Sequence, residues 1–159
     1  MAGRVASVRL HSTAACGIPF VDWIYGEALS WLAAEGLPLW VSLADTPGTE
    51  IMSTLTAFPE LPTVLLGAHY STALMVGPLL RRLPRAHLEL SRYEQIGGVE
   101  ALLAEFGAGR LLYGSYHPRY AMGPVLFYLH HLRCGEDELA CLCAGTLERL
   151  LSRAGRGVP

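Results

Sequence analysis

Polar, titratable side chains stand at the ends of several short apolar runs in this sequence. Three histidines and one aspartate take such positions: His11, His69, His117 and Asp45. Near neutral pH, histidine can act as a base, a proton carrier or a metal ligand. If the apolar runs are strands of one sheet, their carboxyl ends bring these groups toward a common pocket. We therefore predict His69, His117 and Asp45 as catalytic residues, and His11 with His69 as metal ligands.

A plainer interpretation of these positions stays open. Strand ends meet solvent, where polar side chains are common, and Asp45 begins an Asp-Thr-Pro-Gly segment that has the chemistry of a turn. Glu89 also has two interpretations. It alternates with Leu88 and Leu90, so its carboxylate faces either an interior site or an arginine on a covering helix.

Two arginines and a tyrosine are the candidate substrate-binding residues: Arg92, Arg119 and Tyr116. A guanidinium can hold a substrate carboxylate through two parallel hydrogen bonds. An ion pair between Arg92 and Glu94 is the simpler alternative for the first arginine. We expect the three tryptophans to pack between the helices and the sheet or to form an interface. They are Trp23, Trp31 and Trp40.

Short runs with strand character alternate with helical runs along the chain. The expected strands cover residues 5–11, 39–43, 63–68, 86–90 and 110–114. The expected helices cover residues 21–35, 50–58, 74–83, 99–106, 124–132 and 136–152. Asp22 is suitably placed to cap the first helix, and Gly36 to end it.

Strict alternation of strands and helices indicates right-handed crossovers and a parallel sheet. The fold class is therefore α/β. Five strands suit an open doubly wound sheet or a consecutive arc of a (β/α)8 barrel, which needs about 250 residues for complete closure. No glycine-rich dinucleotide fingerprint follows the first strand, and no phosphate-binding Walker loop is present.

Three segments in the second half of the chain carry a resemblance to a known family. They are residues 58–66, residues 79–91 and the Phe-Gly-Ala-Gly-Arg-Leu-Leu-Tyr-Gly-Ser segment of residues 106–115. In this order they resemble the C-terminal half of the amidohydrolase-related TIM-barrel family, which comprises metal-dependent hydrolases and decarboxylases. Residues 8–11 and 36–42 look like the fourth and fifth barrel strands of that family, and residues 144–151 like its closing helix.

The resemblance implies a partial TIM-barrel-like array, in which the five parallel strands are barrel strands 4–8. The chain would then be one amidohydrolase-like domain, residues 1–159, incomplete relative to a full barrel. Ser42 stands where the family has a fifth-strand histidine, and Tyr116 where it has an eighth-strand aspartate. The resemblance places the sixth-strand histidine at His69 if the alignment is shifted, whereas the spacing from Pro59 points nearer to Gly67.

The implied function is hydrolysis or decarboxylation of a small molecule at a degenerate metal site, with zinc or manganese as the possible metal. The alternative is a non-catalytic scaffold or binding relative, or a fragment that needs a partner chain. A five-stranded arc leaves two sheet edges unpaired, so we expect a homo-oligomer or a partner chain that covers them.

Composition limits the other classes of function. The chain has 159 residues, a net charge of −2 and 52% hydrophobic side chains, which disfavours a nucleic-acid-binding protein. We expect a cytoplasmic protein with no membrane contact, because no apolar run reaches the roughly 18 residues of a membrane span. The four cysteines form no Cys-x-x-Cys pair and are expected to be reduced thiols.

Overall fold

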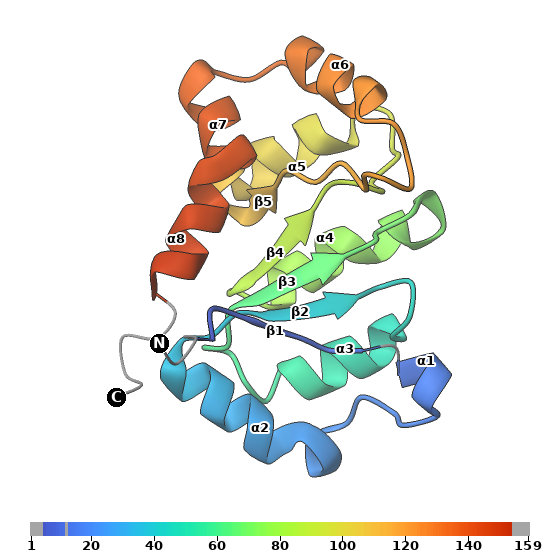
Figure 1. Ribbon diagram of the computed structural model, residues 1–159, viewed down its shortest axis with the longest axis vertical. Coiled ribbons are helices and arrows are strands. Elements are labelled where there is room, and N and C mark those ends of the chain that lie inside the picture. The colour runs from blue at the N-terminus through green and yellow to red at the C-terminus, as the bar shows by residue number, and fades with distance from the viewer. Residues whose placement is uncertain (1–4, 12, 154–159) are drawn as a thin grey trace.

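Five short strands form one parallel sheet in the computed structural model, which describes residues 5–11 and 13–153 (Figure 1). The strands lie in the order β1-β2-β3-β4-β5, each beside its neighbour in the sequence. Their bounds are Val8–Arg9, Leu39–Ser42, Thr63–Leu66, Ala86–Glu89 and Leu111–Leu112. A doubly wound sheet would reverse its strand order at a switch point. The unreversed order is that of a barrel arc, which confirms the predicted partial (β/α)8 array.

The helices follow the strands in turn. They are α1 (Thr13–Cys16), α2 (Asp22–Glu35), α3 (Gly48–Leu55), α4 (Ala73–Arg82), α5 (Gly98–Phe106), α6 (Gly123–His131), α7 (Glu136–Ala140) and α8 (Thr146–Arg153). Short 3-10 turns cover Tyr70–Thr72 and Ala108–Arg110, and a π-helical turn at Cys141–Gly145 joins α7 to α8. In Figure 1 the carboxyl ends of the strands lie on the right, and α8 lies on the left near their amino ends.

The long predicted helices are confirmed with small differences at their ends. Gly36 ends α2 in the left-handed region, at φ 64°. The predicted capping role of Asp22 is wrong in detail, because Val21 takes the capping position and Asp22 Oδ1 accepts a hydrogen bond from the Trp23 N–H at 2.8 Å. The short α1 was not predicted. None of the described helices is long and apolar enough to cross a membrane.

The strands alternate between two different environments. One face, which includes Leu65 and Leu88, packs against the covering helices in the main core. The other face carries a smaller cluster of Val64 and Leu112 with Leu150 of α8. This second face is the one that points to the interior in a closed barrel. On β4 it presents His87 near the amino end and Glu89 at the carboxyl end, because both alternate with the core residues of that strand.

The tryptophans do not share one environment. Trp40 is partly buried against the interior cluster, as expected for packing. Trp23 and Trp31 on α2 are 80% and 47% exposed, so the prediction that they pack in the core is wrong. Their side chains remain available for the interface that was the other expectation.

Candidate functional site

Glu89 stands at the carboxyl end of β4 on the interior face. Its Oε1 accepts a hydrogen bond from the Ser91 N–H at 2.9 Å, and its Oε2 accepts one from Ser91 Oγ at 2.8 Å. Burial raises the pKa of the Glu89 carboxyl, and the hydrogen bonds from Ser91 and the backbone of Gly67 partly oppose that shift. Of its two interpretations, the structure selects the interior one. A buried carboxyl of this kind can exchange a proton closer to neutral pH than a solvated one.

Arg92 lies between two aromatic rings just beyond Glu89 in the chain. Its guanidinium carbon is 5.3 Å from the ring centroid of Tyr116 and 5.3 Å from that of Tyr120, within the range of cation–π attraction. Arg92 Nε lies 3.8 Å from Glu94 Oε1 and is buried without a hydrogen-bond acceptor. The rings hold the guanidinium in place, and its hydrogen-bonding capacity is left largely unused by the described residues.

His69 follows β3 and reaches the same group of residues through Glu94. Its Nε2 lies 3.8 Å from Glu94 Oε2, and its Nδ1 lies 3.3 Å from Ser71 Oγ. The imidazole also packs against the ring of Tyr70, at 3.9 Å between centroids. Glu94 therefore connects the imidazole of His69 with the guanidinium of Arg92. Three of the predicted site residues, His69, Arg92 and Tyr116, thus belong to one connected group.

The other predicted residues lie outside this connected group. His11 follows β1 and His117 follows β5, so the strand order places them at opposite edges of the sheet. The Asp45 N–H donates to the Ser42 carbonyl in the turn after β2, as the plainer interpretation expects. The Arg119 side chain is exposed. The strand order explains the distance between His11 and His117, because each intervening strand adds about 4.8 Å across a sheet. His117 directly follows Tyr116 in the chain, and its side chain is exposed.

A metal centre requires several ligands that converge on one point. Within residues 5–11 and 13–153, no three side chains of histidine, cysteine, aspartate or glutamate are grouped so that they could hold a metal ion. The predicted pair, His11 and His69, would therefore need donors from elsewhere to complete a site. The described residues do not fit a zinc or manganese centre by themselves.

A cavity of about 650 Å³ opens beside Arg92, between the ends of β4 and β5 and the helix α6. Its lining is mainly apolar and aromatic, with Tyr93, Tyr113, Tyr120 and Tyr128 around it. The Tyr128 hydroxyl donates to Glu100 Oε2 at 2.9 Å, which together with burial raises the pKa of that phenol. The volume is that of a small-molecule site.

Sequence reasoning missed these lining tyrosines. For Tyr120, the sequence offered one indication, its position four residues after Tyr116. Residues four apart lie on the same side of the backbone only in a helical segment, and no helix was expected there.

Neither the models of known protein families nor the curated proteins include a match to this sequence. Solved structures do match. An uncharacterised TIM-barrel protein of Bordetella bronchiseptica aligns with a TM-score of 0.81 and 21% identity, over 95% of this chain and 58% of that one. This is the fold of a partial TIM barrel.

Two further solved structures align with this chain over part of their length. The 5-carboxyvanillate decarboxylase of Sphingomonas paucimobilis aligns with a TM-score of 0.66 and 15% identity, over 85% of this chain and 55% of that one. Amidohydrolase 2 of Bifidobacterium longum subsp. infantis aligns with a TM-score of 0.64 and 17% identity, over 92% and 61%. The chain thus spans between 55% and 61% of the length of these three structures.

Proposed function

We propose that this partial barrel belongs to a divergent amidohydrolase-related enzyme that binds a small carboxylate-bearing molecule and hydrolyses or decarboxylates it. The observation that carries the proposal is the position of Arg92, a guanidinium held between two tyrosine rings at the edge of a largely apolar cavity. The carboxyl ends of the strands are where TIM-barrel enzymes place their active sites.

Arg92 would anchor one carboxylate of the substrate. A planar guanidinium recognises a carboxylate bidentately, and the partly buried setting strengthens such a charge-assisted pair. The tyrosine-rich cavity beside it suits an aromatic or otherwise apolar body. A structural relative that acts on a carboxylated aromatic molecule, 5-carboxyvanillate decarboxylase, is consistent with this combination.

Two groups near the anchored carboxylate can move a proton. Ser91 lines the cavity and is hydrogen-bonded to Glu89, whose pKa is raised by burial. His69 lies against Glu94, which also lines the cavity. In hydrolysis such a group takes a proton from the attacking water. In decarboxylation it gives a proton to the carbon that keeps the electron pair of the broken C–C bond as CO2 leaves.

No step of this proposal passes through a metal, because the described residues do not form a metal site. Zinc or manganese bound by His11 and His69 stays a prediction, and metal analysis of the purified protein tests it. The chain spans little more than half of its structural relatives, so further donors would come from outside the described residues. We also propose that a second copy of this chain or a partner chain covers the unpaired edges of the sheet.

The test is calorimetric titration with two probes, 5-carboxyvanillate and its decarboxylated product vanillate, followed by product analysis. Arg92→Met should abolish carboxylate binding, whereas Arg92→Lys should retain part of it as a point charge. Arg82→Met is the matched control, because this exposed arginine ends α4 away from the cavity. Equal binding by Arg92→Met and the unaltered protein would overturn the proposal.

The alternative is a binding protein that keeps the fold and the Arg92 cavity without turnover. Ser42 and Tyr116, at positions where the family carries metal ligands, favour it. The same experiment separates the two functions. Binding lost in Arg92→Met, with no product formed, identifies the binding protein, and product formation identifies the enzyme.

A further inference from the structure

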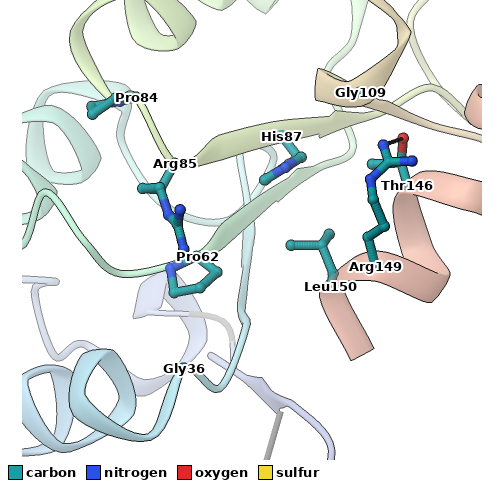
Figure 2. A pocket seen from close by; sticks show the side chains of 9 residues that line it. All are labelled: Gly36, Pro62, Pro84, Arg85, His87, Gly109, Thr146, Arg149 and Leu150. Atoms are coloured by element: carbon teal, nitrogen blue, oxygen red, sulfur yellow. Dashed lines mark hydrogen bonds between the residues drawn. The ribbon is translucent and has the colours of Figure 1, made fainter. Parts of the chain in front are cut away.

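A second cavity lies at the opposite end of the sheet, where the strands begin. It measures about 290 Å³ and lies between the start of β4 and the helix α8 (Figure 2). Arg85 and His87 reach it from the β4 side, and Thr146, Arg149 and Leu150 reach it from α8. In Figure 2 the imidazole of His87 lies between the two arginine side chains.

The lining of this cavity carries positive charge without a matching negative charge. It includes Arg85, Arg149 and His87 but no aspartate or glutamate. Arg149 Nη2 donates to Thr146 Oγ1 at 3.0 Å and to Cys141 Sγ at 3.2 Å, and neither partner is a carboxylate. Neither arginine forms an ion pair with a carboxylate within the described part of the chain. Two guanidinium groups beside one cavity thus have N–H donors that are not paired with a carboxylate of the described residues.

The imidazole of His87 is partly buried in the lining of the same cavity. Its Nδ1 lies 3.3 Å from the Thr63 carbonyl oxygen, and burial lowers its pKa to about 4. The charges of Arg110 and Arg85 lower that pKa further. Arg110 itself is occupied, because its guanidinium donates to the backbone carbonyls of Leu80, Leu83 and Ala86. The unused positive charge therefore belongs to the cavity arginines.

We propose that this cavity binds a phosphate-type oxyanion, either free or as the terminal group of a small phosphomonoester, through Arg85 and Arg149 with His87 between them. Tetrahedral oxyanions with several acceptor oxygens suit guanidinium donors. The space exceeds that of the ion alone and leaves room for a small organic body. The site lies at the amino ends of the strands, so it is separate from the cavity beside Arg92.

The test is titration of the protein with inorganic phosphate, glycerol 3-phosphate and glycerol, followed by calorimetry and by the imidazole NMR signals of His87. Both phosphate probes should bind, shift the His87 signals and raise the pKa of His87, because a nearby anion favours the protonated imidazole. Tighter binding of glycerol 3-phosphate assigns the site to a phosphomonoester, and equal or tighter binding of phosphate to the free ion. Binding of glycerol with the same affinity as glycerol 3-phosphate would overturn the proposal.

Arg85→Gln is the primary variant, because the Arg85 guanidinium makes no hydrogen bond or ion pair with the other described residues. Phosphate affinity should fall on the order of tenfold, the loss typical of one charge-assisted contact. Arg149→Gln should act similarly, with its melting temperature measured because it also contacts Thr146. Arg133→Gln, beyond α6, is the matched control. Unchanged affinity in both cavity variants, or His87 signals that stay fixed under saturating phosphate, would contradict the site.

Discussion

The carboxylate of Glu89 occupies the volume that a side chain at position 114 would need. A Cβ at Gly114 would overlap the Glu89 carboxylate, far inside any van der Waals contact. Gly114 follows β5, the neighbour of β4, so the two residues meet across the mouth of the sheet. The absence of a side chain at position 114 is what allows the Glu89 carboxylate to reach Ser91 in its present position.

We expect Gly114→Ala to destabilise the protein by about 1–3 kcal/mol, the usual cost of overpacking, and to displace Glu89 from Ser91. Chemical denaturation measures the loss. Gly123→Ala is the control, because a Cβ there has no neighbour within 4 Å. In a Glu89→Ala background the same Gly114→Ala change should cost little. Equal losses in both backgrounds would show that the two residues are not coupled.

The stacking of Arg92 on Tyr120 can be tested through the carboxylate probe. Tyr120→Leu removes one of the two rings and should weaken binding of 5-carboxyvanillate about two- to fivefold, the equivalent of one exposed cation–π contact. Tyr120→Phe keeps the ring and should bind like the unaltered protein. If Phe and Leu at this position weaken binding equally, the hydroxyl group rather than the ring acts on the ligand.

The His87 imidazole should make the protein less stable in acid. Its pKa is about 4 in the folded chain, below the ordinary value of 6.5, so the unfolded chain binds the extra proton between these values. The free energy of unfolding should therefore be unaffected by His87 above about pH 6.5. It should fall by at most about 3 kcal/mol as the pH drops toward 4.

Denaturation of the protein and of His87→Gln across pH 4 to 7, in buffer without phosphate or sulfate, measures this effect. Glu89 has the opposite effect on the free energy of unfolding. Because its pKa is raised in the folded chain, its contribution to stability is lost as the pH rises. The difference between the two proteins cancels the Glu89 contribution. Parallel stability profiles for the two proteins would refute the assignment to His87.

The edges of the sheet predict association. Among the described strands, β1 pairs only with β2 and β5 only with β4, so each leaves one side unpaired. Unpaired edges and the exposed Trp23 and Trp31 favour contact with a second copy or a partner chain. Light scattering over a dilution series should give at least twice the mass of one chain. The mass of a single chain at every concentration would contradict this expectation.

Most of the elements could be predicted because they depend on local periodicity. The runs that became β2 and β3 are rich in apolar and β-branched or aromatic residues, and β4 alternates apolar and polar residues. Gly36 marked the end of α2 through its left-handed backbone. The outer strands are shorter than expected. β1 and β5 keep two residues each, because a strand extends only where a neighbour supplies hydrogen bonds.

The candidate site was only partly predictable. His69, Arg92 and Tyr116 could be found because strand ends converge in any parallel sheet. The role of Glu94, which lies 3.8 Å from both His69 and Arg92, depends on side-chain directions that the sequence does not specify. His11 had the same pattern but lies at the far edge of the sheet, because strand order decides which ends are neighbours. His117 also had this pattern and adjoins Tyr116, but its side chain is exposed.

The order of strands and helices, the parallel sheet and the polar strand ends follow from the sequence alone, because they rest on short-range periodicity and turn chemistry. The tertiary structure decided which of those polar ends act together. Only the packing of β4 against β5 and α8 brings Glu89 beside Gly114, places Arg92 between two tyrosines, and sets His87 between Arg85 and Arg149. Such contacts join residues far apart in the chain, and their energies depend on burial and distance, which exist only once the chain is folded.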